Sequence, residues 1–210
     1  MKSDNRQQPA IIFDFGGVLI DWNARHLYHK LFDDTRAMER FLAEIDFHGW
    51  NLELDRGRPY AESVVELSRQ FPHYADLIKA YDERWEESLN GPIQATVEIL
   101  QALKTRGYAL YGLTNWAAEK YEFIHHKYPF LGLFDDIVVS GKVKLVKPDP
   151  RIFALLLEKT KRPAAECLFI DDSETNVTAA RSLGFKTILF KSAEQLGMEL
   201  SRLGLLDGER

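Results

Sequence analysis

The stretch Ile11-Ile12-Phe13-Asp14-Phe15-Gly16-Gly17-Val18 decides the fold, together with its downstream counterpart Leu168-Phe169-Ile170-Asp171-Asp172-Ser173. Each is a short apolar run that ends in acid and then in small residues. In an open parallel sheet such runs are buried strands, and the residues at their carboxyl ends face the ligand crevice. Carboxylates from two strands would meet there and repel one another unless a cation lies between them. We therefore expect a hard divalent metal, Mg²⁺, at this point.

The rest of the chain alternates strand and helix patterns. Apolar runs that predict strands occupy residues 11–15, 109–113, 137–139, 168–170 and 187–190. Amphipathic patterns that predict helices occupy residues 96–104, 151–159 and 175–183. This alternation predicts an α/β fold with a Rossmann-like, doubly wound parallel sheet.

The segment from residue 20 to residue 91 has a different texture, with helical periodicity, many aromatic residues and no convincing strand. A crossover between parallel strands needs only about a dozen residues, so this one carries additional structure. We expect an all-helical cap over residues 20–91, a catalytic core of residues 10–19 plus 92–210, and a flexible tail over residues 1–9. Trp22 and Trp85 belong either to the core of the cap or to a subunit contact, which leaves the oligomeric state open.

Composition narrows the class of partner. The net charge of −5 gives no basic excess for a nucleic acid or an anionic membrane, so we expect a small-molecule partner. The single cysteine, Cys167, lies at the start of an apolar run and predicts a buried thiol in a reducing cytoplasm. No segment is apolar over the length that crosses a bilayer.

Three motifs other than the acid pair could carry chemistry. Asp14, at a strand end before two glycines, could attack a phosphorus or carbon centre, although an acid in a glycine turn is also ordinary. Thr114 and Asn115 could donate to phosphate oxygens or could simply cap a helix. Lys147 could neutralise an anion, as a point charge in the loop before Pro148, or could be solvated.

The acid pair Asp171-Asp172 is the strongest local signal, because adjacent acids directly after a buried strand cost desolvation and repulsion. A helix N-cap is the alternative reading of this pair. The order of the motifs decides between the readings: acid, Thr-Asn, Lys-Pro and paired acid each stand at a strand end or a helix start.

With these motifs the chain resembles the haloacid dehalogenase-like superfamily of hydrolases over roughly residues 10–205, in the subgroup with a helical cap after the first motif. It is similar to sugar-phosphate phosphatases such as α-D-glucose 1-phosphate phosphatase. The resemblance implies that Asp14 is a nucleophile that forms an aspartyl-phosphate and that Lys147 bridges nucleophile and phosphate. Thr114 and the Asn115 region would hold the phosphoryl oxygens.

The resemblance also implies a Mg²⁺ site formed by Asp14, the backbone carbonyl of Gly16 and Asp172. Asp171 would be a direct or water-mediated partner of the metal, and Asn176 would support the site. The expected activity is Mg²⁺-dependent hydrolysis of a small phosphorylated metabolite.

The chain departs from the family pattern at Gly16, where many of these phosphatases have a second aspartate that acts as general acid and base. A positioned proton donor typically contributes roughly 10²- to 10⁴-fold to the rate. Either the leaving group needs little help, as in sugar 1-phosphates and acyl phosphates, or the cap supplies the donor. The candidate cap residues are His48, Asp55 and Arg56, of which His48 and Arg56 are the predicted substrate contacts.

Two other functions stay open at this stage. A 2-haloacid dehalogenase would use Asp14 against carbon, but its site resembles a metal-free version without the acid pair. A non-enzymatic descendant that binds a phosphorylated ligand or a partner is favoured by the missing acid at Gly16, and disfavoured by the joint presence of Asp14, Lys147 and Asp172.

Overall fold

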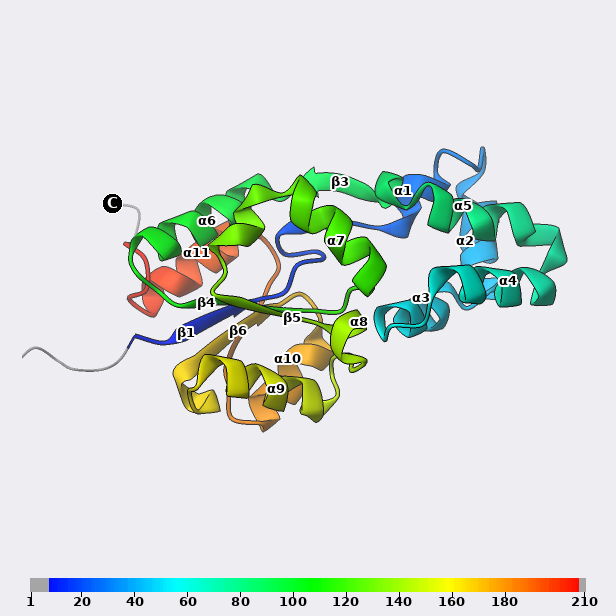
Figure 1. Ribbon diagram of the computed structural model, residues 1–210. Coiled ribbons are helices and arrows are strands. Elements are labelled where there is room, and N and C mark those ends of the chain that lie inside the picture. The colour runs from blue at the N-terminus through cyan, green and yellow to red at the C-terminus, as the bar shows by residue number, and fades with distance from the viewer. Residues whose placement is uncertain (1–7, 208–210) are drawn as a thin grey trace, which may run out of the picture.

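The computed structural model describes residues 8–207 and contains a five-stranded parallel sheet (Figure 1). Its strands are β1 (Ala10–Phe13), β4 (Leu110–Thr114), β5 (Asp136–Val139), β6 (Cys167–Asp171) and β7 (Lys186–Leu189). The spatial order is β5-β4-β1-β6-β7, so the chain moves outward from β1 first on one side and then on the other. The carboxyl end of β1 is therefore the point where the strand order reverses, and ligands bind at such points in open sheets. The predicted fold class is confirmed.

Helices cover both faces of the sheet. One face carries α6 (Gln94–Thr105), α7 (Ala118–Lys127) and α11 (Ala193–Arg202), and the other carries α9 (Pro150–Thr160) and α10 (Glu174–Ser182) (Figure 1). The side chains of β1 alternate between the two layers: Ile11 and Phe13 join the hydrophobic cluster on the α6 side, and Ile12 joins the cluster on the α9 side. Burial on both faces explains why β1 reads as a continuous apolar run.

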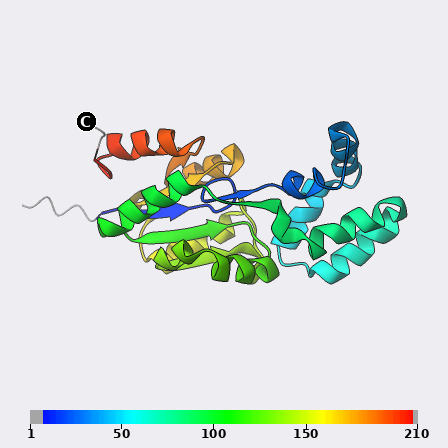
Figure 2. The ribbon, with the colours of Figure 1, turned by 90° about the horizontal axis from the view of Figure 1, so that it is seen from above.

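Between β1 and β4 the chain forms a helical insertion that projects beyond the carboxyl ends of the strands (Figure 2). Its helices are α1 (Ala24–Tyr28), α2 (Thr35–Glu44), α3 (Phe47–Asp55), α4 (Tyr60–Gln70) and α5 (Ala75–Glu83), with 3₁₀ turns at Pro72–Tyr74 and Trp85–Ser88. Its core is aromatic: the ring of Tyr28 packs against Phe41 at 5.0 Å, and Phe47 packs against Tyr81 at 4.9 Å between ring centroids.

The expectation that this segment holds no strand is wrong. β2 (Ile20–Trp22) and β3 (Leu89–Pro92) form an antiparallel pair at the base of the insertion. Strands of three and four residues are too short to show an alternating pattern, and Gly91 and Pro92 read as a turn. The pair joins the two ends of the insertion at one place beside the sheet.

The structure also tests the expected helices of the core, the expected buried cysteine and the expected N-terminal tail. The three predicted helices match α6, α9 and α10 within two residues, whereas α7, the short α8 (Ser140–Val143) and α11 were not predicted. Cys167 is buried and free. The predicted tail over residues 1–9 lies mostly outside the described residues. No helix within residues 8–207 is long and apolar enough to cross a membrane.

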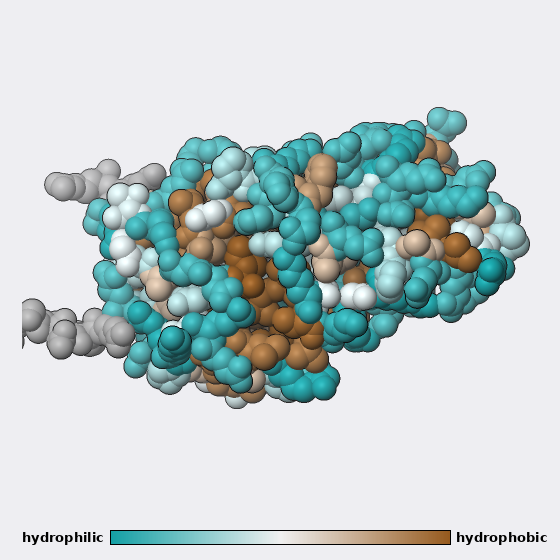
Figure 3. Space-filling model, in the orientation of Figure 1, coloured by the Kyte–Doolittle hydropathy of each residue, from teal (hydrophilic) through white to brown (hydrophobic). Residues whose placement is uncertain are grey.

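The surface drawn in Figure 3 is mainly hydrophilic. An apolar band crosses it over the edge strand β5 and the neighbouring part of the core. The reaction centre predicted from the sequence lies elsewhere, at the carboxyl ends of β1, β4 and β6.

Candidate active site

Asp14 directly follows β1, and the turn after it is held by its own hydrogen bonds. The backbone N–H of Asp14 donates to the carbonyl oxygen of Ile170 at 2.9 Å, and the N–H of Phe15 donates to Asp14 Oδ1 at 2.7 Å. Gly17 has a φ of +73°, and a Cβ there would lie 2.3 Å from Asp172 Oδ2. Only glycine therefore lets the turn and the Asp172 carboxylate approach so closely.

Three carboxylates gather at this point. Asp14, Asp171 and Asp172 each offer an oxygen within 4.8 Å of the others. Burial is the main cause that raises the pKa of Asp14 to about 7, and the negative charges of Asp171 and Asp172 add to it. Burial, followed by the charge of Asp171, also raises the pKa of Asp172. A cation among these groups would remove both penalties.

Lys147 lies inside the cluster and is buried, with 2% of its surface exposed. Its Nζ is 2.8 Å from Asp14 Oδ1 and 2.6 Å from Asp171 Oδ2. Burial lowers the pKa of Lys147, but the attraction of Asp14 and Asp171 outweighs burial and raises it, so the lysine is charged. One ammonium does not balance three carboxylates, and the remaining hard oxygen donors fit Mg²⁺.

The two adjacent acids differ in what surrounds them. Asp171 is fully buried, and its oxygens accept hydrogen bonds from the Ser173 N–H at 2.8 Å, from Asn176 Nδ2 at 3.1 and 3.2 Å, and from Lys147 Nζ. Asp172 lines the cavity in front of the sheet, whereas Asp171 does not. Asp172 is thus the more accessible of the two as a metal ligand, whereas Asp171 contacts Lys147 on the side away from the cavity.

Thr114 ends β4 and Asn115 directly follows it, and the two side chains have different surroundings. The Thr114 hydroxyl is buried without a hydrogen-bond partner among the described residues, so it can still donate to a ligand. The Asn115 side chain is already engaged with the backbone of Lys147: Nδ2 donates to its carbonyl at 3.0 Å, and Oδ1 accepts from its N–H at 2.7 Å. The side chain of Asn115 therefore positions Lys147.

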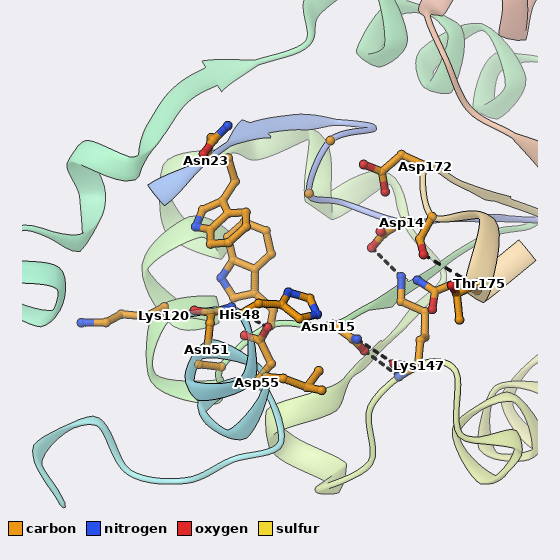
Figure 4. Close-up of a pocket in the computed structure, with 18 of the residues that line it drawn as sticks. Asp14, Asn23, His48, Asn51, Asp55, Asn115, Lys120, Lys147, Asp172 and Thr175 are labelled. Carbon is orange, nitrogen blue, oxygen red and sulfur yellow. Dashed lines mark hydrogen bonds and ion pairs between the residues drawn. The ribbon is translucent and has the colours of Figure 1, made fainter. Parts of the chain in front are cut away.

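A cavity of about 530 Å³ lies between the reaction centre and the helical insertion (Figure 4). Asp14, Gly16, Lys147 and Asp172 form its floor. Its walls come from the insertion and from the loop after β4; they include Trp22, Asn23, His48, Asn51, Asp55, Tyr60, Tyr81, Trp85, Trp116 and Lys120. The indole N–H of Trp116 is buried and has no partner in the described part of the chain, so a ligand oxygen can accept from it.

One face of helix α3 presents three polar side chains and one leucine to the cavity. His48, Asn51, Leu52 and Asp55 all line it, at the i, i+3, i+4 and i+7 spacing that places residues on one helix face. Arg56 lies off this face, since consecutive helical residues point about 100° apart. It does not line the cavity, and its guanidinium pairs with Glu53 instead. The structure thus brings His48 to the site and does not bring Arg56 there.

The sequence reasoning missed Asn23, Asn51, Trp116 and Lys120. The helical spacing from His48 to Asp55 would have indicated Asn51, and Trp116 directly follows the Thr-Asn pair. Asn23 caps helix α1 by accepting from the Arg25 N–H at 3.0 Å, and no local pattern indicates its place at the cavity.

The chain is similar in sequence to a known family of hydrolases and to several characterised proteins. Residues 9–184 match the family described as haloacid dehalogenase-like hydrolase. The chain is 28% identical to the sesquiterpene phosphatase astK of Aspergillus oryzae (92% of this chain, 95% of the relative). It is 24% identical to a D-ribitol-5-phosphate phosphatase of Bacteroides thetaiotaomicron (91% and 96%). Other relatives are longer: the chain spans 36% of the drimenol cyclase drtB of Aspergillus calidoustus.

Among solved structures, the chain is similar to a haloacid dehalogenase family enzyme of Bacteroides thetaiotaomicron in complex with magnesium and inorganic phosphate. The TM-score is 0.69 and the sequence identity 25%, over 89% of this chain and 96% of the other.

Proposed function

The chain belongs to the haloacid dehalogenase-like hydrolases, and we propose that it is a Mg²⁺-dependent phosphatase of small, sugar-phosphate-like metabolites. The observation that carries the proposal is the buried cluster in which Lys147 bridges Asp14 and Asp171, next to the exposed oxygens of Asp172 and the unpaired hydroxyl of Thr114. Two relatives that match over nearly their whole length, the Aspergillus oryzae and Bacteroides thetaiotaomicron proteins, are phosphatases by name, and the magnesium and phosphate complex belongs to a structural neighbour.

In this proposal the Asp14 carboxylate attacks phosphorus and forms an aspartyl-phosphate, which water then hydrolyses. Lys147 holds Asp14 in place and offsets the charge of the phosphoryl group, while the Thr114 hydroxyl donates to one of its oxygens. Asp14, the Gly16 carbonyl and Asp172 would hold Mg²⁺, with Asp171 behind them. When bound, the metal would supply charge neutralisation at the phosphoryl oxygens.

The cavity walls support an oxygen-rich substrate of limited size. Indole and phenol rings of Trp22, Trp85 and Tyr60 provide apolar faces, and Asn51 and the Trp116 N–H provide hydrogen bonds. A sugar or polyol presents both C–H faces and hydroxyl groups, and it matches this mixture. Neither phosphatase relative reported above is named for glucose 1-phosphate, so we propose the substrate as a class.

Two alternatives are weaker. A 2-haloacid dehalogenase has no use for the gathered acids Asp171 and Asp172, which would stay close together without a cation. A non-enzymatic binding protein would not need a lysine held by two buried carboxylates at the nucleophile.

A panel of sugar, polyol and acyl phosphates, assayed for phosphate release with and without Mg²⁺, tests the proposal. We expect metal-dependent turnover of at least one member. Chloride release from 2-chloropropionate without metal would support the dehalogenase instead. Binding of phosphorylated compounds with no turnover of any would support the non-enzymatic alternative.

A further inference from the structure

The missing acid at Gly16 leaves the reaction without a proton donor beside the nucleophile. Gly16 has no side chain, and Lys147 keeps its proton because two carboxylates hold it. The leaving oxygen of the substrate must point away from Asp14, toward the helical insertion, because attack and departure are in line. A donor is therefore needed on the wall that the insertion contributes.

We propose that Asp55, at the end of α3, is this donor and that it takes the proton back during hydrolysis of the aspartyl-phosphate. This inference rests on the proposed phosphatase function. Asp55 lines the same cavity as Asp14 and Lys147, which form its floor. It lies on the face of α3 that is turned toward this cavity (Figure 4).

The Asp55 carboxyl is held in a defined position. Asn51 Nδ2 donates to its Oδ2 at 3.0 Å, and Asn51 is fixed in turn by the Tyr81 hydroxyl, which donates to its Oδ1 at 2.7 Å. The N–H of Ala117, in the loop that follows Thr114, is near enough to the Asp55 carboxyl to favour its charged form and oppose the rise in its pKa. Asp55 is thus held by its own helix and lies beside the loop next to the reaction centre.

The backbone around Asp55 is attached to the core in the same way. Ser140 Oγ, at the start of α8, donates to the Asp55 carbonyl oxygen at 2.6 Å. Gly57, with a φ of +98°, lies so close to the core that a Cβ there would be 2.7 Å from the Gly141 carbonyl oxygen. These contacts fix the distance between Asp55 and the floor of the cavity.

The protonation of Asp55 suits an acid that must also act as a base. Burial raises the pKa of its carboxyl to about 7, against the opposing effects of the Ala117 N–H and the Lys147 charge. The ideal pKa of such a group lies near the working pH. The other titratable or charged groups on the cavity wall are Arg25, His48, Tyr60, Tyr81 and Lys120, with Asp14, Asp172 and Lys147 on the floor.

The tyrosines do not compete for this role. Burial is the main cause that raises the pKa of Tyr60 and of Tyr81 well above the ordinary value, so neither releases a proton near neutral pH. Lys120 donates to Asp82 at 2.6 Å and lies over the Tyr60 ring. His48 is exposed at the rim of the cavity and is the remaining competitor of Asp55 for this role.

The two half-reactions balance. In the first, an Asp14 oxygen bonds to phosphorus, the bond from phosphorus to the leaving oxygen breaks, and that oxygen takes the Asp55 proton and departs as an alcohol. In the second, a water oxygen bonds to phosphorus, the bond to Asp14 breaks, and the Asp55 carboxylate takes the proton of the water. Phosphate is released, and both carboxyl groups return to their starting state.

The test compares kcat/KM for an alkyl ester, glycerol 2-phosphate, with kcat/KM for p-nitrophenyl phosphate, whose leaving group needs no proton. Asp55→Asn should lower the value for the alkyl ester by roughly 10²- to 10⁴-fold and the value for the aryl ester by less than about tenfold. Asp55→Glu should recover part of the alkyl activity. Asp76→Asn, an exposed change on α5, is the matched control and should alter neither value.

The pH profile separates Asp55 from His48. For the alkyl ester, kcat/KM of the wild type should fall as the pH rises through about 7, because the protonated form of Asp55 is lost. The fall should be absent in Asp55→Asn and retained in His48→Gln. Equal losses of Asp55→Asn on both esters, or an unchanged alkyl rate, would overturn the inference. A wild type that cleaves no phosphate ester would instead overturn the proposed function.

Discussion

Replacing Lys147 by methionine tests whether the lysine holds the acid cluster together. The change keeps most of the side-chain volume but removes the ammonium that lies 2.8 Å from Asp14 and 2.6 Å from Asp171. Asp171 is fully buried and Asp14 meets water only at the floor of the cavity, so neither carboxylate regains full hydration in exchange. Breaking a buried ion pair from one side costs about 3–5 kcal/mol.

This cost translates into a measurable shift. For a chain of this size, 1 kcal/mol corresponds to about 2–4 °C in melting temperature, so Lys147→Met without metal should melt about 6–20 °C below the wild type. Added Mg²⁺ should restore part of the loss, because it neutralises the same carboxylates. Thermal unfolding followed by circular dichroism, in EDTA and then in Mg²⁺, measures both effects.

Lys159→Met is the matched control. Lys159 also contacts an aspartate, Asp136, at 2.7 Å, but the pair is exposed, and exposed pairs contribute about 0–1 kcal/mol. If both variants shift the melting temperature equally, the buried cluster does not stabilise the fold more than an exposed ion pair does. A loss of phosphatase activity of less than about tenfold in Lys147→Met, about 1.4 kcal/mol, would place the lysine away from the reacting atoms.

Four further substitutions test the rest of the site. Asp14→Asn should abolish phosphate release while the far-ultraviolet circular dichroism stays unchanged; near-wild-type turnover would exclude Asp14 as the nucleophile. Mg²⁺ should raise the melting temperature of the wild type, and Asp172→Ala and Gly17→Ala should each lose most of this rise, the latter because its Cβ would displace the Asp172 carboxylate. Asp55→Asn should gain stability relative to the wild type as the pH rises from about 4 to about 7, since the unfolded wild-type carboxyl ionises over this range before the folded one does; a gain independent of pH would contradict the raised pKa of Asp55.

The core could be predicted because its signals are local. Asp14 directly follows one buried strand, and Asp172 directly follows a second one, β6. The carboxyl ends of parallel strands lie at the same edge of a sheet, so these two side chains are expected to lie close together. Lys147 precedes a proline and therefore stands in an extended loop before a helix. For Asp14 and Asp172, the position of the strand was enough to predict where the side chain lies; for Lys147, the loop before the helix was enough.

The cavity-lining residues of the insertion could not be predicted equally well, because they depend on which face of helix α3 is turned toward the sheet. Asp55 and Arg56 are neighbours in a charged segment, yet one lines the cavity and the other pairs with Glu53. Trp22 and Asn23 reach the cavity only because β2 pairs with β3, through strands too short to read from their pattern. Such placements follow from packing between distant segments rather than from local sequence.

The close approach of Gly57 to Gly141, and the hydrogen bond from Ser140 to Asp55, have a consequence for exchanging modules between homologues. A chimera that receives residues 20–91 of this chain gains the cavity walls that the insertion contributes. It does not gain Ser140 and Gly141, the core residues that the loop around residue 55 contacts. A larger residue than glycine at the position of Gly141 would collide with the backbone of residues 116–118 and move the carbonyl against which Gly57 packs, so the hybrid would retain its fold but misplace residue 55. Grafts should therefore carry Ser140 and Gly141 along with the insertion.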